Sequence, residues 1–235
     1  MSQQYETVLF DFGGTLDADG VAWKERVHRH YRAEGLEMSA KAFDPVFYAA
    51  DDRLVGALPR EADLAATVRE LTDNIETELG RRAGLNDPAR GLRVATRFLA
   101  EASASFARNR PLLQKLAARY RLGIVSNFYG NLEAVCQGAG IAPLFGVMVD
   151  SQRVGVEKPD PAIFQAALGP LGAAPETTLF VGDSLRRDRQ GARRMGMGFV
   201  WIAPKDVQQA EARAAKAPLD HPVVTRFGDL AEILT

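Results

Sequence analysis

Residues 7–16 read TVLFDFGGTL, a threonine and three apolar residues that run into an aspartate and then a pair of glycines. Short runs of β-branched and apolar residues are typical of strands that are buried on both faces of a parallel sheet. In open α/β sheets, ligands bind beyond the carboxyl ends of the strands. The stretch therefore predicts a buried strand at Thr7–Phe10 that carries Asp11 to the ligand-binding edge of a sheet.

Four more runs of this kind follow along the chain. They alternate with stretches that contain residues typical of the beginning or the end of a helix. The further predicted strands are Leu122–Ser126, Val147–Asp150, Thr178–Val181 and Phe199–Ile202. Pro111 should open a helix at Leu112–Tyr120, and Asp160 with Pro161 should cap and begin another. A further helix is predicted over residues 185–195, ending at Gly196. The pattern predicts the α/β class, with a Rossmann-like three-layer core built on a parallel sheet.

The stretch from residue 20 to residue 107 departs from this alternation. It has few β-branched runs and much Ala, Leu, Glu and Arg at helical spacing. The four helices expected there are Val21–Ala33, Lys41–Leu54, Glu61–Leu79 and Gly91–Ala107. We therefore expect an inserted all-helical cap domain at 20–107, and a core domain formed by residues 1–19 and 108–235.

Composition excludes several classes of protein. Hydrophobic residues make up 46% and charged residues 25% of the 235, which is an ordinary globular mixture. The net charge of −1 creates no general attraction for nucleic acid or for an anionic membrane, so we expect neither partner. The single cysteine, Cys136, excludes an internal disulfide. Neither a signal peptide nor a spanning segment is recognisable, and we expect a cytoplasmic protein.

Polar residues fall at or just after the ends of the predicted strands. They are Asp11, Ser126 with Asn127, Lys158 after a short loop, and Asp183. Parallel strands would gather these groups along one edge of the sheet. Two carboxylates, a hydroxyl and an ammonium suit a phosphate dianion bound together with a divalent metal. A carboxylate can attack phosphorus and form an aspartyl-phosphate.

These residues resemble, in order, the four motifs of the haloacid dehalogenase-like (HAD) superfamily of hydrolases. The first motif is similar to Asp11–Leu16, the second to Ser126-Asn127 and the third to Lys158-Pro159. The fourth is similar to Gly182-Asp183-Ser184 with Asp188. The resemblance covers essentially the whole chain, and the helical insert resembles the C1-type cap that closes over the substrate in this family.

The resemblance implies a phosphoric monoester hydrolase that acts on a small phosphorylated metabolite through an aspartyl-phosphate. Asp11 would be the nucleophile, and Lys158 would bridge it to the phosphoryl group. The residues implied to bind phosphate are Ser126, Asn127, Gly14 and Thr15. The ligands implied for Mg²⁺ are Asp11, the backbone carbonyl of Gly13 and Asp183, whereas Asp188 would support the metal site or bind through water.

One position departs from the family's pattern. Phosphatases of the family usually carry a second aspartate, the general acid and base, where this chain has Gly13. Loss of such a group typically slows a reaction by about 10²–10⁴-fold. Asp17 and Asp19 lie on the same loop, and whether either replaces it stays open. The alternative is a catalytically impaired protein on this fold that binds phosphate and metal or serves in regulation.

Two other interpretations carry less weight. Dehalogenases of the family usually have a tyrosine at the position of Gly13 and need no metal, so the aspartates of the fourth motif argue against that activity.

The arginine-rich run at 186–194 is expected to be a solvated helix face. The alternative for Arg187 is a contact with substrate or with a partner, because this residue adjoins the fourth motif.

Overall fold

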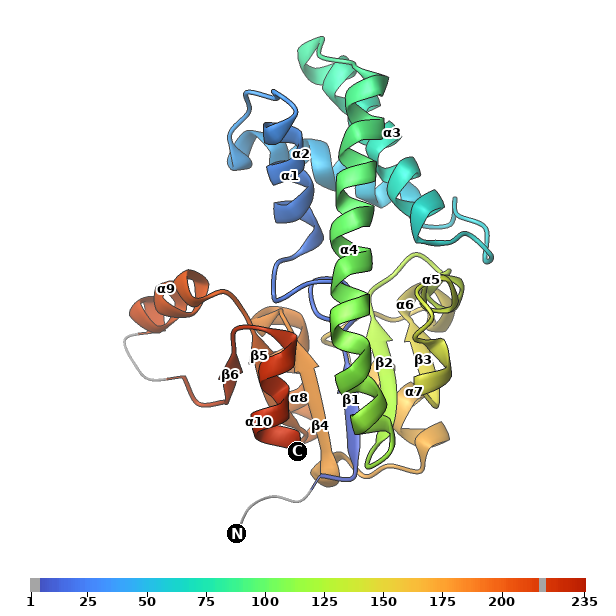
Figure 1. The fold of residues 1–235 in the computed structure, drawn as a ribbon, viewed down its shortest axis with the longest axis vertical. Coiled ribbons are helices and arrows are strands. Elements are labelled where there is room, and N and C mark those ends of the chain that lie inside the picture. Colours follow the sequence, from blue (N-terminus) through green and yellow to red (C-terminus); the bar gives the residue numbers. More distant parts are fainter. Residues whose placement is uncertain (1–4, 216–218) are drawn as a thin grey trace.

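The computed structural model describes residues 5–215 and 219–235, so residues 1–4 and 216–218 of the predicted core lie outside it. Its strands form one parallel sheet with the order β3-β2-β1-β4-β5-β6 (Figure 1). They are β1 (Thr7–Phe10), β2 (Arg121–Ser126), β3 (Val147–Asp150), β4 (Thr178–Gly182), β5 (Gly198–Ile202) and β6 (Val223–Val224). The α/β class and all five predicted strands are confirmed. The sequence analysis missed β6, because two residues are too few to show a period.

The strand β1 lies in the middle of the sheet, between β2 and β4. Phe10 is in register with Ile124 on one side and with Val181 on the other. The main-chain N–H of Asp11 still donates to the carbonyl of Val181 at 2.9 Å. Asp11 therefore leaves the sheet beside the last residues of both neighbouring strands.

Helices cover both faces of the sheet, and the sheet separates the hydrophobic core into two halves. Val8 and Phe10 face one half and Leu9 faces the other, as expected from the alternation of side chains along a strand. The first half is closed by the C-terminal part of α4 (Pro88–Ala117), by α5 (Leu132–Gly138), η5 (Phe227–Leu230) and α10 (Ala231–Leu234). The second is closed by α7 (Pro161–Leu171) and α8 (Gln190–Met195). The predicted three-layer core is confirmed. The remaining elements are η2 (Ala142–Leu144), α6 (Ser151–Val154), η3 (Pro175–Thr177) and α9 (Lys205–Ala215).

The predicted helices of the insert lie together beyond the carboxyl edge of the sheet (Figure 1). They are α1 (Trp23–Ala33), α2 (Ala40–Asp51) followed by η1 (Asp52–Leu54), α3 (Leu64–Ala83) and the first part of α4. Helix α3 begins three residues later than predicted, because the Asp63 side chain accepts from the N–H of Ala66 at 2.8 Å and caps it. The insert stands over the strand ends that carry the polar residues.

Helix α4 runs without a break from residue 88 to residue 117 and joins the insert to the sheet (Figure 1). The prediction that Pro111 opens a separate helix is wrong. The proline removes one main-chain hydrogen bond, but Phe106, Leu113 and Leu116 continue a single buried stripe across it, and their packing outweighs that loss. The predicted cap of 20–107 remains a prediction, and its second boundary falls inside this helix. Even so long a helix is too polar to cross a bilayer, and no other helix among residues 5–215 and 219–235 qualifies either.

An ionic cluster within the insert ties α1 to α4. Glu101 of α4 lies 3.2 Å from Arg26, 2.8 Å from Arg29 and 2.8 Å from the Nε2 of His30. Partial burial raises the pKa of Glu101, but the hydrogen bond with His30 and the two guanidinium charges outweigh it and lower that pKa to about 2. The charged form of Glu101 therefore favours the folded state.

We expect Glu101→Gln to make the protein less sensitive to acid. Because the pKa of Glu101 falls from 4.5 to about 2 on folding, its charge stabilises the fold above about pH 4.5, and this contribution is lost as the pH falls toward 2. The side chain is 32% exposed, so solvent screening leaves about 1 kcal/mol. Because part of this contribution remains at pH 3, the variant should lose about 0.5 kcal/mol less than the wild type in urea unfolding at about pH 6 and about pH 3.

Glu37→Gln is the matched control, because Glu37 is exposed and has no hydrogen bond or ion pair in the described chain. It should lose as much stability on acidification as the wild type. Equal acid sensitivity of the Glu101 variant and the wild type would contradict the role of this cluster.

Candidate active site

The nucleophile candidate Asp11 is held between two of the predicted partners. Its Oδ1 accepts hydrogen bonds from Lys158 Nζ at 2.6 Å and from Ser126 Oγ at 3.0 Å. Asp11 follows β1, Ser126 ends β2, and Lys158 comes from the loop between α6 and α7. All three side chains are buried. Folding thus brings together groups that lie up to 147 residues apart in the sequence.

Three carboxylates, including that of Asp11, lie close together at this edge of the sheet. Asp11, Asp183 and Asp188 each offer an oxygen, and these atoms lie within 4.8 Å of one another. The ammonium of Lys158 lies 2.8 Å from Asp188 Oδ1. Burial together with the charges of Asp11 and Asp188 raises the pKa of Asp183 well above its usual value. Burial opposes the charge on Lys158, but Asp11 and Asp188 outweigh it and raise the pKa of Lys158.

The cluster fits a divalent cation. Carboxylate oxygens are ligands that hard cations such as Mg²⁺ prefer. One ammonium among three carboxylates leaves negative charge uncompensated, and such crowding is costly in a buried site. Asp188 Oδ1 lies 2.8 Å from Lys158 Nζ, and a carboxylate oxygen in contact with one ammonium still has a lone pair for a further ligand. The predicted contribution of the Gly13 carbonyl stays a prediction.

Gly14 lets the loop after β1 pass close to the carboxylate of Asp183. Its φ of 88° is in the left-handed region, and a Cβ there would collide with the carboxylate of Asp183. Its N–H already donates to Asp17 Oδ1 at 2.7 Å. The hydroxyl of Thr15 is buried and has no hydrogen-bond partner in the described chain. Phosphate binding by Gly14 and Thr15 stays a prediction.

Asn127 holds the main chain of Lys158 from both sides. Its Oδ1 accepts from the N–H of Lys158 at 2.8 Å, and its Nδ2 donates to the carbonyl of the same residue at 3.3 Å. These contacts make Asn127 a positioning residue for the lysine. The phosphate contact expected of Asn127 stays a prediction.

Asp188 lies on a π-helical turn, η4 (Leu185–Arg189), that precedes α8. The predicted single helix over 185–195 is therefore wrong in its first turn, although it ends at Gly196 as expected. The N–H of Ser184 donates to Asp188 Oδ2 at 2.9 Å and fixes this buried carboxylate. π-Helical turns occur frequently at functional sites.

Arg187 is exposed beside this turn and has no hydrogen bond or ion pair from its side chain in the described part of the chain. Desolvation disfavours its charge, but the carboxylates of Asp11, Asp188 and Asp183 outweigh this and raise its pKa. The guanidinium thus lies close enough to interact with the carboxylate cluster. A contact of Arg187 with substrate stays a prediction.

Asp17 is an integral part of the loop after β1. Its carboxylate accepts from the N–H of Gly14, from Trp23 Nε1 at 2.8 Å and from Arg26 Nη1 at 2.6 Å. Asp17 and Arg26 are both fully buried. The sequence analysis considered Asp17 only as a replacement acid, and the structure gives it a different role, which is to bind the loop to helix α1. The sequence contains no local signal for this role, because the buried partner Arg26 comes from another element.

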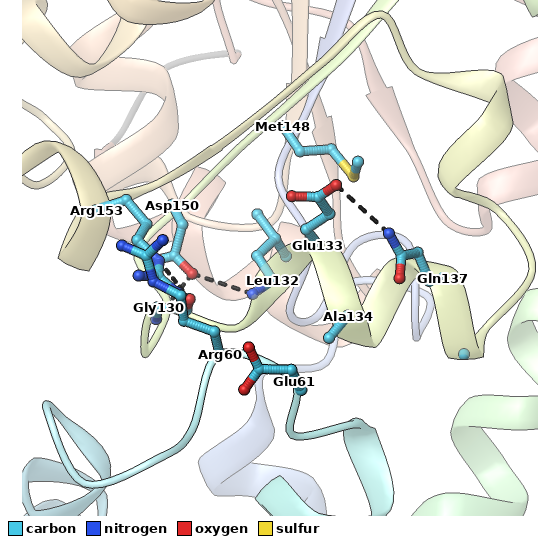
Figure 2. Close-up of a pocket in the computed structure, with 11 residues that line it drawn as sticks. Arg60, Glu61, Gly130, Leu132, Glu133, Ala134, Gln137, Met148, Asp150 and Arg153 are labelled. Carbon is cyan, nitrogen blue, oxygen red and sulfur yellow. Dashed lines mark hydrogen bonds between the residues drawn. The ribbon is translucent and has the colours of Figure 1, made fainter.

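A separate hollow of about 620 Å³ lies between the insert and the core (Figure 2). Arg60 and Glu61 line it from the insert, and Asp150 and Arg153 line it from the core. Asp150 accepts from the N–H of Gly130 at 2.8 Å, and Arg153 donates to the carbonyl of the same residue at 2.6 Å. These charged groups support the loop after β2, and the hollow includes none of the residues of the carboxylate cluster.

Comparison with known proteins gives a family and a fold. A family model described as haloacid dehalogenase-like hydrolase matches residues 5–196. A haloacid dehalogenase-like hydrolase domain-containing protein 3 of Danio rerio is 27% identical over 210 residues, which are 86% of each chain. A glyceraldehyde 3-phosphate phosphatase of Methanothermobacter thermautotrophicus is 33% identical over 117 residues, 49% of this chain and 51% of that protein. With several curated relatives, the chain thus shares only about half of their length or less.

A solved structure supports the same fold. A putative hydrolase from Bacillus subtilis, bound to magnesium, superposes with a TM-score of 0.57 at 18% identity. The superposition covers 98% of this chain and 99% of that one. At this identity the similarity establishes the fold alone and does not indicate a substrate.

We expect Asp17→Asn to destabilise the fold by about 3 kcal/mol, because it leaves the guanidinium of Arg26 buried beside only the more distant Glu101. Urea unfolding measures the loss. Asp206→Asn, at an exposed position on α9, is the control and should stay within about 0.5 kcal/mol of the wild type. If the two variants were equally stable, Asp17 would not hold the loop as inferred.

Proposed function

The chain belongs to the haloacid dehalogenase-like hydrolase family, and we propose that it is a Mg²⁺-dependent phosphatase of small phosphorylated metabolites. The observation that carries this proposal is the position of Asp11, whose carboxylate is held by Lys158 and Ser126 and faces Asp183 and Asp188. An attacking carboxylate, a fixed ammonium and a cation-binding pair form the set of groups that transfer of a phosphoryl group requires.

The charges at the site favour phosphate over a halogenated acid. A phosphate monoester brings a dianion, which the ammonium of Lys158 and the guanidinium of Arg187 can meet from two sides. Displacement of a halide by Asp11 would need no metal, and it would leave the buried carboxylate of Asp188 and the partly buried carboxylate of Asp183 without a cation. A phosphatase gives all of these groups a role.

Each residue has a defined part in the proposed reaction. One oxygen of Asp11 attacks phosphorus and forms the aspartyl-phosphate. Lys158 orients Asp11 and, with Ser126, stabilises the charge that develops on the phosphoryl oxygens. Asp183 and Asp188 would hold Mg²⁺ together with Asp11. When bound, the ion would neutralise the phosphoryl group and shield the attacking carboxylate from it.

The relatives support phosphatase activity without naming a substrate for this chain. One partial relative is a glyceraldehyde 3-phosphate phosphatase, and another, from Thermus thermophilus, is a phosphoserine phosphatase, 45% identical over 65 residues. Because these alignments cover 51% and 26% of the two relatives, we carry over only the reaction class. A cytoplasmic location stays a prediction.

A second candidate function is a protein that binds phosphate and metal and turns over slowly or not at all. The observation that favours it is Gly13, since no carboxylate stands two residues after the nucleophile. Both functions use the same pocket, and only the fate of the phosphate differs between them.

We expect the wild type to hydrolyse an aryl phosphate in the presence of Mg²⁺, and Asp11→Asn to abolish this turnover because an amide is a poor nucleophile toward phosphorus. Release of the phenol and of phosphate measures the reaction, and a chelator should stop it in the wild type. Asp206→Asn is the control for substitution of an exposed aspartate and should keep full activity. If the wild type and Asp11→Asn give the same background, the chain is a binding protein.

A further inference from the structure

Trp23 occupies the space into which a side chain on residue 13 would extend. A Cβ built on Gly13 would lie 3.2 Å from Nε1 and 3.3 Å from Cδ1 of the indole. The indole is buried and packs against Phe98 and Phe128, with ring centroids 5.0 and 5.9 Å away. A side chain on residue 13 would therefore require the ring to shift by a few tenths of an ångström within this aromatic cluster. An aromatic ring thus contacts the point at which the side chain of a general acid on residue 13 would start.

Neither Trp23 nor its partner is free to give a proton to a substrate. The indole N–H donates to Asp17 Oδ2, and an indole is a hydrogen-bond donor that does not release its proton near neutral pH. Asp17 is fully buried and already accepts from Gly14 and Arg26 as well. The nearest carboxylate of the loop is therefore fixed within the protein interior.

Asp19, the other acid of this loop, is also engaged. Its two oxygens accept from Arg108 Nη2 at 2.8 Å and from the main-chain N–H of Phe227 at 2.9 Å. These bonds tie Asp19 to α4 and to the C-terminal part of the core. The structure therefore uses both aspartates that could replace the missing acid as structural anchors.

The strongest rival proton source is a pair on the side of the insert. The hydroxyl of Tyr129, in the loop after β2, donates to Asp51 Oδ1 at the end of α2, at 2.5 Å. Burial raises the pKa of Asp51 and, with the charge of Asp51, raises that of Tyr129 well above its usual value. The Tyr129 proton is thus directed toward Asp51, and the experiment below tests the pair directly.

We propose, on the basis of the function proposed above, that Asp11 accepts phosphoryl groups without a general acid and is then dephosphorylated without a general base. The preferred donors would be those whose leaving group departs unprotonated, namely acyl, enol and aryl phosphates. Alkyl phosphomonoesters, whose alkoxide must be protonated as it leaves, would be poor substrates.

The two steps balance with solvent as the only proton source and sink. In the first, the P–O bond to Asp11 forms, the P–O bond to the leaving group breaks, and the leaving oxygen departs with the electron pair as an anion. In the second, water attacks phosphorus, the carboxylate of Asp11 departs, and the proton of water passes to bulk solvent. A good donor makes the first step fast, but the second step has no base, so the aspartyl-phosphate accumulates.

Phenyl phosphate and cyclohexyl phosphate test the first step, because they match in size and differ in the acidity of the leaving group. In the wild type, we expect kcat/KM for the cyclohexyl ester to be about 10²–10⁴-fold lower than for the phenyl ester. A positioned general acid typically supplies a factor of this size, and the chain has none. Nitrophenyl phosphate tests the second step. It should give a burst of about one phenol per chain, and the intact mass should show one added phosphoryl group, neither of which Asp11→Asn should give.

The outcomes separate this inference from the proposed function. If no donor gives turnover that depends on Asp11, the phosphatase proposal fails. If the wild type hydrolyses both esters at similar rates, or hydrolyses nitrophenyl phosphate without a burst, the phosphatase stands and this inference is overturned. Asp51→Asn and Tyr129→Phe should keep the wild-type ratio of the two esters, and a larger ratio in either variant would identify that pair as the proton source instead.

A pair of variants tests the position of the indole. Trp23→Leu with Gly13→Asp makes room for a carboxylate beside Asp11, and Trp23→Leu alone is its matched control. The double variant should narrow the ratio of phenyl to cyclohexyl hydrolysis at least about tenfold relative to this control. Circular dichroism verifies that both are folded. An unchanged ratio in two folded variants would show that this position is not where the acid is missing, and the ester series in the wild type does not depend on either variant folding.

Discussion

The concentration of three carboxylates around one buried ammonium is the constraint on which the rest of the site depends. Like charges so close together in a poorly solvated place repel strongly, and one lysine cannot compensate all of them. The parallel sheet creates this situation, since it ends β1 and β4 side by side and delivers Asp11 and Asp183 to the same edge. A divalent cation would offset this repulsion and would in turn attract a phosphate dianion, which is why we propose phosphate chemistry at this edge.

A second buried charge holds this arrangement in place. Asp17 connects the loop after β1 to α1 through Trp23 and Arg26, and Arg26 in turn reaches Glu101 on α4. Because α4 continues from the insert into the core, the position of the nucleophile's loop and the position of the insert are coupled. A buried ion pair adds little net stability compared with apolar packing, but breaking one is costly. We therefore interpret the Asp17–Arg26 pair as a device that fixes geometry.

The sequence predicted what depends on local pattern and failed where distant packing decides. Buried strands and the residues at their ends follow from short apolar runs, so the sheet and the meeting of Asp11, Ser126, Lys158 and Asp183 were predictable. Pro111 was misread because the local preference to end a helix was weaker than the continuous buried face of α4. The π-helical turn at Asp188 has no periodic signal. The contact of Trp23 with Gly13 joins two elements and cannot be seen in either one alone.

The exchange of an acid for an indole has a physical rationale. A general acid accelerates such a reaction by about 10²–10⁴-fold, or about 3–5 kcal/mol of barrier. A buried tryptophan contributes a similar amount to stability, since its removal costs about 3–5 kcal/mol. For an alkyl ester, the acceleration lost without the acid is as large as the stability that the indole provides. For a donor whose leaving group departs as a stable anion, protonation gains little, so the packing of Trp23 is obtained at almost no catalytic cost. A glycine at position 13 is thus consistent with a site adapted to activated phosphates.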